Sequence, residues 1–504
     1  MTKARLIIDH EFTIAPVNPR LFGGFVEHLG RHIYDGIYEP GHPQSDENGF
    51  RLDVIELVKE LGVTAIRYPG GNFVSGYRWE DGVGPKNERP RRLDLAWHSI
   101  ESNQFGLDEF VRWSEKVGCE LMLATNLGTR GLQQAIDLIE YTNVRSGTAL
   151  ADRRIAHGVT EPYAVKLWCL GNEMDGPWQV GHSNADDYGK LAAQVARSMR
   201  KIDDQVELVV CGSSNRQMPT HGNWERTVLD HTYDLVDFIS CHAYYQEHDG
   251  DLASFLASGL DMDGFIHDVV ATIDHVKTVK RSDRTVNISF DEWNVWYRSR
   301  YPQSERPTGI DQWGEAPRLL EDIYSVADAV AFGGLLITLL RHADRVTSAS
   351  LAQLVNVIGP IMTEPGGPAW KQTTFFPFAQ ASSLGRGEVL QVKIDGDEHE
   401  TEQYGSVTAI DGIATFNAER NSTTIFVINR DIGETVELEI SIRGDRLPTG
   451  AKATTLSDPD VYAKNTLEEP ERVAPHDNDS VTVDGSNLRV EIPPVSWTVI
   501  EVAH

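Results

Sequence analysis

The most regular feature of this 504-residue chain is an alternation of short apolar runs and longer amphipathic segments over residues 20–360. The runs are rich in β-branched residues and too short for helices, whereas apolar residues between them recur with a helical period. Strands are therefore predicted at residues 21–27, 63–68, 120–126, 165–170, 206–211, 238–244, 286–291 and 346–353. Helices are predicted at residues 52–61, 107–117, 185–202, 265–279 and 317–340.

Polar residues follow nearly every predicted strand at its carboxyl end. They include Glu27, Arg67, Asn72, Asn126, Asn172, Glu173, Ser214, Asn215, His242, Tyr244, Glu292, Asn294 and Gln353. Strands that alternate with helices form right-handed βαβ units with a parallel sheet. Eight such units with polar residues at one rim predict a (β/α)8 TIM barrel of the α/β class. An open doubly wound sheet would instead gather its polar residues at one switch point.

The pattern changes near residue 376, where the helical periodicity gives way to alternating strands separated by loops rich in Asp, Asn, Pro and Gly. This pattern predicts a C-terminal antiparallel β-sandwich, jelly-roll-like in form. Residues 4–14 are also strand-like, and we expect them to add a strand to the sandwich. The predicted division is an N-terminal strand at 1–18, a catalytic barrel at 19–376 and a β-sandwich at 377–504.

Composition excludes several classes of partner. The formal net charge of −29 and pI of about 4.9 give a surface that repels nucleic acid and anionic membranes, whereas neutral sugars are unaffected. The longest apolar stretch, residues 329–340, is too short to span a bilayer, and the first residues leave no room for an export signal. Four cysteines without CxxC or Cys/His spacing predict buried thiols, no structural zinc and a cytoplasmic location.

Two of the strand ends carry the strongest candidate chemistry. One apolar run ends in Gly171-Asn172-Glu173, and another ends in Asp291-Glu292. Glu173 follows the fourth predicted strand and Glu292 the seventh, so both face the same barrel mouth. Paired carboxylates of this kind cleave glycosidic bonds. They lie about 5 Å apart in retaining enzymes and roughly 6.5–9.5 Å apart in inverting ones, a gap that the sequence leaves open.

The neighbours of these two residues suggest their roles. The Asn172 amide can donate a hydrogen bond to a sugar hydroxyl beside the anomeric centre, which makes Glu173 the general acid/base. Glu292 would be the nucleophile, with Tyr244 as a hydrogen-bond partner.

Extended motifs around these positions resemble those of glycoside hydrolase family 51 α-L-arabinofuranosidases. The matching segments are 24–31, 67–73, 171–179, 291–297 and 353–356, and the resemblance covers essentially the whole chain. It implies a retaining exo-enzyme that needs no cofactor or metal, forms homohexamers and releases terminal α-L-arabinofuranosyl groups from arabinose-containing oligosaccharides. It also implies the acid/base Glu173, the nucleophile Glu292 and the substrate-binding residues Glu27, Asn72, Asn172, Tyr244, Gln353, Trp178 and Trp296.

Other interpretations of these residues remain open. Glu27 could pair with Arg31 one helical turn on, and Tyr244 could pack at the rim. Trp178 and Trp296 could equally fill loop packing. For the whole chain the alternatives are another retaining barrel glycosidase, an endo-glucanase or endo-xylanase, and a non-catalytic carbohydrate-binding barrel.

Overall fold

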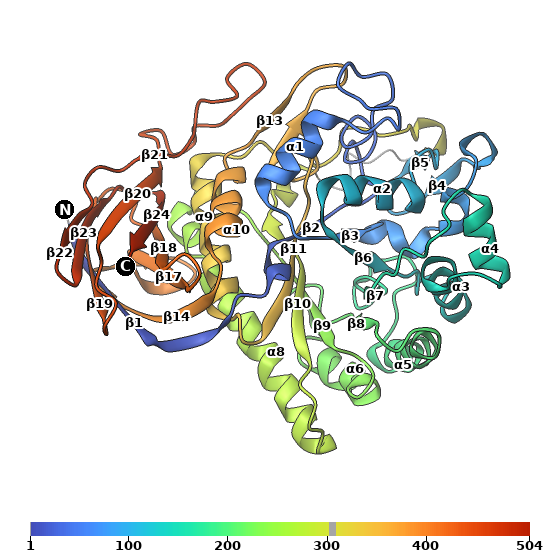
Figure 1. Ribbon diagram of the computed structural model, residues 1–504, viewed down its shortest axis with the longest axis horizontal. Helices are drawn as coiled ribbons and strands as arrows, with labels where there is room; N and C mark the ends of the chain where they lie inside the picture. The colour runs from blue at the N-terminus through green and yellow to red at the C-terminus, as the bar shows by residue number, and fades with distance from the viewer. Residues whose placement is uncertain (1, 302–308) are drawn as a thin grey trace.

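A closed parallel barrel forms the larger part of the protein (Figure 1). The computed structural model describes residues 2–301 and 309–504, and within them eight strands close the barrel. In order around it they are β2 (Gly23–Phe25), β3 (Ala65–Tyr68), β6 (Glu120–Ala124), β7 (Leu167–Leu170), β8 (Glu207–Val210), β9 (Phe238–Tyr245), β10 (Asn287–Val295) and β11 (Val346–Leu351). Each coincides with a predicted strand, so the predicted barrel is confirmed.

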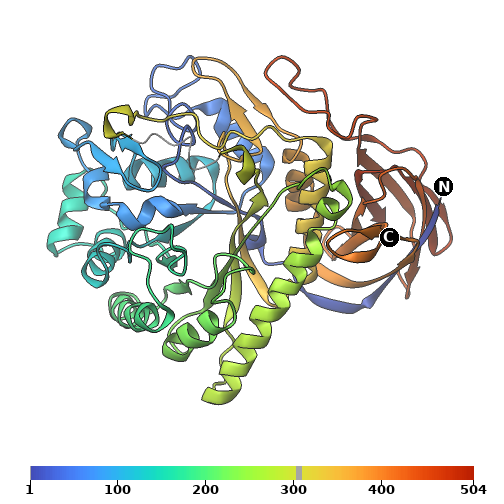
Figure 2. The ribbon, with the colours of Figure 1, turned by 180° about the vertical axis from the view of Figure 1, so that it is seen from behind.

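Helices cover the outside of the barrel (Figure 2). They are α1 (Leu52–Leu61), α2 (Leu107–Val117), α3 (Leu132–Asn143), α4 (Ala149–Ala156), α5 (Ala185–Ile202), α6 (Asn223–Thr232), α7 (Leu252–Leu256), α8 (Gly259–Lys280), α9 (Val326–Arg341) and α10 (Phe375–Leu384). Local sequence sets their ends. Helix α1 stops at Gly62, which adopts φ 81° and returns its N–H to the last turn. Helix α5 starts at Asn184, whose side chain accepts from the Asp187 N–H.

Helix α9 begins later than the predicted start at residue 317. Ser325 and Asp328 form a capping box, in which the Ser325 side chain accepts from the Asp328 N–H and the Asp328 carboxylate accepts from the Ser325 N–H. The capping box therefore starts the helix at Val326. Strand β10 differs in the other direction, because it continues through Asp291 and Glu292 to Val295 rather than ending at residue 291.

The C-terminal region is a curled sheet that the first strand of the chain joins. In the described residues it has ten strands in the order β21 (His476–Asp477), β20 (Gly450–Leu456), β24 (Ser496–Ala503), β18 (Ser422–Asn429), β17 (Ile410–Asn417), β14 (Glu388–Gly396), β1 (Thr2–Pro16), β19 (Val436–Arg443), β23 (Asn487–Ile492) and β22 (Thr482–Asp484). The described pairings are antiparallel except between β1 and β19, which run parallel. Inward-facing residues such as Leu6, Ile425 and Ile500 form its core.

Short two-stranded hairpins complete the described strands. They are β4 (Arg92–Asp94) with β5 (Ser99–Glu101), β12 (Ile361–Thr363) with β13 (Ala369–Lys371), and β15 (Glu398–Thr401) with β16 (Gly405–Thr408). The predicted domain ranges 1–18 and 19–376 include residues 1 and 302–308, which lie outside the described residues. The predicted boundary at 376/377 falls inside α10, so the division of the chain at that point stays a proposal.

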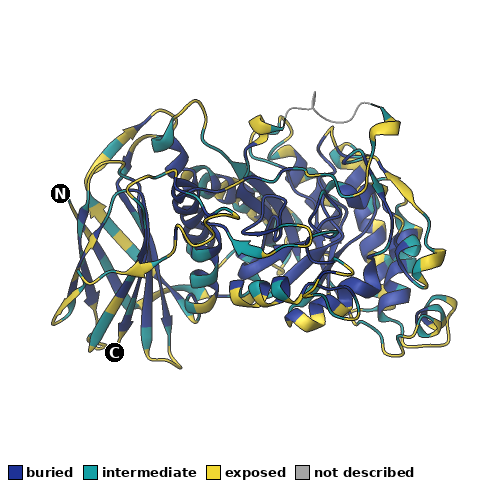
Figure 3. Ribbon diagram, turned by 90° about the horizontal axis from the view of Figure 1, so that it is seen from above, coloured by how far each residue is buried: buried dark blue, intermediate teal, exposed yellow. Residues whose placement is uncertain are grey.

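A buried helical layer joins the barrel to the sheet (Figure 3). Helix α9 contacts β10 and β11 of the barrel on one side and β17, β18 and β24 of the sheet on the other. Gly333 lets it approach closely, because a Cβ there would lie 2.4 Å from the Trp497 ring. Burial on both sides explains the apolar stretch at residues 329–340, and no described helix is both long and apolar enough to cross a membrane.

Candidate active site

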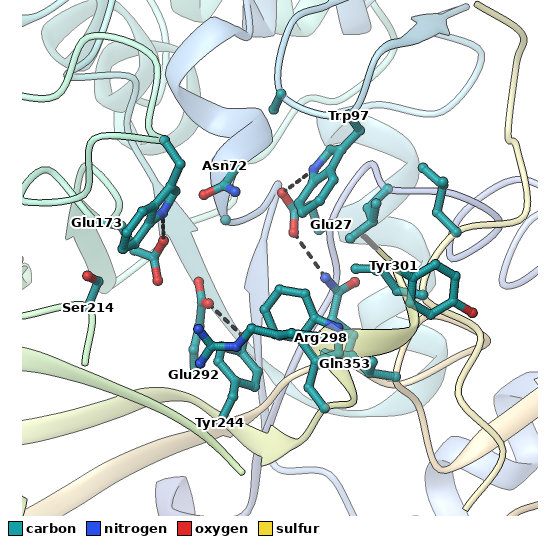
Figure 4. A pocket seen from close by; sticks show the side chains of 18 of the residues that line it. Glu27, Asn72, Trp97, Glu173, Ser214, Tyr244, Glu292, Arg298, Tyr301 and Gln353 are labelled. Atoms are coloured by element: carbon teal, nitrogen blue, oxygen red, sulfur yellow. Dashed lines mark hydrogen bonds between the residues drawn. The ribbon is translucent and has the colours of Figure 1, made fainter. Parts of the chain in front are cut away.

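The carboxyl ends of the barrel strands surround a cavity of about 510 Å³ (Figure 4). The predicted residues Glu27, Asn72, Glu173, Trp178, Tyr244, Glu292, Trp296 and Gln353 all line it. Its size lies within the range of small-ligand pockets, about 300–1,000 Å³. The structure therefore brings side chains from widely separated parts of the chain into one pocket.

A sharp turn aims Glu173 into this cavity. Gly171 (φ 94°) and Glu173 (φ 42°) both adopt left-handed backbone conformations directly after β7. That conformation is rare for a residue with a side chain, and such outliers concentrate at functional sites. Glu173 accepts hydrogen bonds from Trp178 Nε1 at 2.6 Å and has His242 Nδ1 2.9 Å from its second oxygen. Its carboxyl group is thus fixed on both sides.

Glu292 lies on β10, across the pocket from Glu173. It accepts from Arg67 Nη1 at 2.7 Å through one oxygen and from the Tyr244 hydroxyl at 2.8 Å through the other. Each oxygen of Glu292 is thus held by a donor, and one of the two donors is a buried cation. Carboxylate oxygens of Glu173 and Glu292 lie within 4.8 Å of each other. This gap matches the retaining arrangement and is shorter than the inverting one.

His242 links the two carboxylates to a deeper anion. Its Nδ1 faces Glu173, and its Nε2 lies 2.9 Å from Asp291 Oδ1. Burial by itself would lower the pKa of His242, but the nearby carboxylates of Glu292, Asp291 and Glu173 outweigh it and raise the pKa to about 10. His242 is therefore a cation at neutral pH, and it holds Glu173 in place by a charge-assisted hydrogen bond.

Glu27 closes the opposite side of the pocket. Gly71 makes room for it, because a Cβ there would lie 2.5 Å from Glu27 Oε2. Phe73 N and Trp97 Nε1 each donate to its Oε1 at 2.9 Å, and Gln353 Nε2 donates to its Oε2 at 3.0 Å. Burial raises the pKa of Glu27 to about 8 despite the donors. The group can therefore carry a proton at neutral pH and exchange hydrogen bonds with a hydroxylated ligand.

Asn172 occupies a different place from the other predicted residues. It is buried and absent from the cavity wall. Its side-chain oxygen accepts from Arg67 Nη2 at 2.5 Å, and its Nδ2 donates to Gln179 Oε1 at 3.3 Å. Asn172 therefore braces Arg67, and its predicted contact with a sugar hydroxyl stays a prediction.

Comparison with known proteins agrees with this geometry. Residues 57–254 match the family model for the α-L-arabinofuranosidase 1 domain, and residues 291–496 match the model for the α-L-arabinofuranosidase C-terminal domain. The solved structure of a family 51 α-L-arabinofuranosidase from Bifidobacterium longum superposes with a TM-score of 0.95 at 48% identity, over all of both chains. An exo-α-(1→6)-L-arabinofuranosidase of Bifidobacterium longum is 59% identical over 100% of this chain and 98% of its own. This chain belongs to glycoside hydrolase family 51.

The predicted family is thus confirmed over the full length of the chain. A further relative is an intracellular exo-α-(1→5)-L-arabinofuranosidase of Streptomyces lividans, 57% identical over 100% of this chain and 76% of its own. The linkages in the two relatives' names differ.

Several residues of this family 51 site were not predicted to take part in it. Arg67 lies near the end of a predicted strand, so its place at the barrel mouth could be predicted. Its contact with Glu292 could not, because that contact depends on how the strands close into a barrel. His242 also belongs to the polar residues near the strand ends, but its contacts with Glu173 and Asp291 join it to other parts of the barrel. Trp97 and Arg298 lie in connecting segments, where sequence periodicity gives no signal, yet both line the pocket.

The carboxylate oxygens and histidine nitrogens of the site are atoms that could also bind a metal ion. In the described residues, two groups bring three possible ligand atoms together: Glu173–His242–Glu292, and Asp263–His267–His342 beside α8 and α9. Hydrogen bonds to Arg67, Tyr244, Trp178 and Asp291 already engage the first group. The expectation of a metal-independent, cofactor-free site stays a prediction.

Proposed function

We propose that this protein is a retaining, exo-acting α-L-arabinofuranosidase that acts on arabinose-bearing oligosaccharides. The separation of the Glu173 and Glu292 carboxylate oxygens, within 4.8 Å, carries the proposal, because it fits double displacement. Family membership supports the choice of sugar, since the curated relatives are named exo-acting arabinofuranosidases.

The first step is transfer of the arabinofuranosyl group to the enzyme. A Glu292 oxygen attacks the anomeric carbon while Glu173 donates a proton to the glycosidic oxygen, so the glycosidic bond breaks and a covalent ester to Glu292 forms. In the second step Glu173 takes a proton from water, the water oxygen attacks the same carbon, and Glu292 leaves as a carboxylate. Two inversions give net retention.

The surrounding residues prepare these groups for their tasks. Arg67 and Tyr244 bind both oxygens of Glu292 and orient its carboxyl group for attack. Glu27, Asn72 and Gln353 lie where they can bind the arabinose hydroxyls, and Trp178 and Trp296 flank the pocket.

The names of the relatives also bear on where the protein acts and which linkage it cleaves. We propose action inside the cell, as for the relative named intracellular, and assembly into a homo-oligomer, a hexamer by family resemblance. The preferred linkage is left between 1→5 and 1→6, because the two relatives differ. Light scattering after size-exclusion chromatography measures the assembly.

Hydrolysis of 4-nitrophenyl α-L-arabinofuranoside tests the function. The wild type should release 4-nitrophenol rapidly and leave xylan and carboxymethylcellulose uncut. No release, together with cleavage of either polymer, would favour the endo-glycosidase alternative. No hydrolysis of any of these substrates would favour the non-catalytic carbohydrate-binding alternative.

Azide rescue tests the division of roles. Glu173→Ala should slow substrates with poor leaving groups by about 10²–10⁴-fold, the usual worth of a general acid. With 4-nitrophenyl α-L-arabinofuranoside, whose leaving group needs little protonation, the covalent intermediate still forms, so azide should restore turnover and give the α-azide. Glu292→Ala should lose turnover and, with azide, give the β-azide by a single inversion. Each variant is the control for the other, and the same product anomer from both would contradict the assignment.

A further inference from the structure

A second cavity adjoins the first at the same barrel mouth. Its volume is about 420 Å³, and it shares Asn215, Tyr244, Trp296 and Arg298 with the first cavity. Its other walls come from the segments that follow β8 and β9 and from the β15–β16 hairpin of the sheet. Two parts of the fold therefore build it jointly.

The wall between the cavities is one layer of side chains. The Tyr244 and Trp296 rings meet edge to face with centroids 5.0 Å apart. The Arg298 guanidinium lies 5.2 Å from the Trp296 ring centroid and 5.9 Å from that of Tyr244. Tyr244 also donates a hydrogen bond to Glu292, so this wall is in direct contact with the proposed nucleophile. The second cavity therefore lies directly beside the first, on the far side of these three side chains.

The lining of the second cavity suits a neutral, hydroxylated ligand. Asp261 accepts from the Tyr245 hydroxyl at 3.1 Å and from Arg216 Nη1 at 3.3 Å. This group offers both acceptors and donors to sugar hydroxyls. The Tyr404 ring supplies an apolar surface of the kind on which sugars stack. In the same lining Asp251 and Asp261 are matched in number by Arg216 and Arg298, so neither charge dominates.

The hairpin that carries Tyr404 is fixed to the barrel. Gln403 N donates to the Oγ of Ser254, a residue of α7, at 3.0 Å. Burial, with a smaller effect of Asp261, raises the pKa of Tyr404 to about 12, so its hydroxyl stays protonated and can donate. The sheet thereby presents a preformed surface to the cavity.

We propose that this second cavity binds the second sugar of the leaving group. Counted from the cleaved arabinofuranosyl group, this is the third sugar of the substrate. The proposal rests on the proposed function. The first cavity then holds the arabinofuranosyl group and the adjacent sugar, and Asp261, Arg216 and Tyr404 select substrates at least three sugars long. The C-terminal sheet takes part in recognition through Tyr404 and Gln403.

Chain-length dependence tests the proposal. The substrates are arabinobiose and arabinotriose of whichever linkage, 1→5 or 1→6, the wild type cleaves faster. The wild type should have the higher kcat/KM on the trisaccharide. In Tyr404→Ala and in Asp261→Asn the ratio of the two kcat/KM values should fall by about tenfold, the loss of one ring contact or one charged hydrogen bond. Glu402→Ala, in the same hairpin but outside both cavities, should keep the wild-type ratio.

The ratio separates binding from folding, because both substrates report the same quantity of active enzyme. A wild-type ratio near one, or an unchanged ratio in both cavity variants, would overturn the proposal for this cavity. Absence of hydrolysis of 4-nitrophenyl α-L-arabinofuranoside by the wild type would instead overturn the proposed function.

Discussion

Tyr244→Phe isolates one hydrogen bond at the proposed nucleophile. The substitution removes the hydroxyl that donates to Glu292 Oε2 at 2.8 Å. It keeps the aromatic ring, and with it the edge-to-face contact with Trp296 and the cation contact with Arg298. The change therefore acts on the charge and orientation of Glu292, and it leaves the shape of the pocket unchanged.

The magnitude follows from the partners of Glu292. A hydrogen bond to a charged group contributes about 1.5–3 kcal/mol, which corresponds to about 10–150-fold in rate. Glu292 keeps its 2.7 Å bond from Arg67, so it is not left without a partner. We therefore expect kcat/KM for 4-nitrophenyl α-L-arabinofuranoside to fall by about 10–150-fold, with kcat accounting for most of the loss.

Tyr163→Phe is the matched control. It removes a tyrosine hydroxyl that donates to Asp108 at 2.6 Å, away from the pocket, so it measures the general effect of losing such a bond. Initial rates and thermal unfolding are recorded for both variants. The reasoning is refuted if Tyr244→Phe stays within about twofold of wild type, or if both variants lose activity equally.

Three further predictions follow from buried contacts. Arg67→Lys keeps the charge but cannot serve Glu292 and Asn172 together, so kcat/KM should fall by about 10–100-fold, measured on the same substrate. Because the folded-state pKa of Glu27, about 8, exceeds its ordinary value of 4.5, its contribution to stability is lost as pH rises from 4.5 through 8. Glu27→Gln should flatten this part of the wild-type dependence of Tm on pH, and an unchanged slope would contradict the shift. Trp497→Ala should destabilise the protein by about 3–5 kcal/mol, because it empties the space between α9 and the sheet and loses the bond to Gln380; Tm and urea unfolding measure the loss.

The barrel was predictable because its strands are buried on both faces and read as apolar runs. The ends of the strands were less so. Strand β10 was predicted to stop at polar residues, but Asp291 is 1% exposed inside it, with Arg67 and His242 as counter-charges. From sequence alone, a charged residue is taken as the end of a buried strand unless a counter-charge is known. Here the counter-charges lie on other strands, so the sequence does not reveal them.

The site was predictable where a carboxylic acid follows an apolar run in the sequence. Glu173 and Glu292 satisfy that condition, although Glu292 lies inside β10, and the order of strands placed them at one mouth. The partners of each carboxylate depend on side-chain directions across the barrel, so neither the contact of His242 with Glu173 nor that of Arg67 with Asn172 could be inferred from the sequence. Trp97 lies between β4 and β5, and its bond to Glu27 joins segments whose relative placement no periodicity fixes.

The buried charges explain why these residues act as one unit. Arg67, Asp291 and His242 are each 2% exposed or less, and each contacts at least one of the others or a proposed catalytic carboxylate. Removing one member leaves an uncompensated buried charge, which costs more than the lost contact alone. Substitutions at Arg67 and His242 should therefore combine non-additively. The Gly171-Asn172-Glu173 turn belongs to the same unit, because Asn172 holds Arg67 and Arg67 holds Glu292. The motif thus positions both carboxylates: one directly, and the other through a single guanidinium.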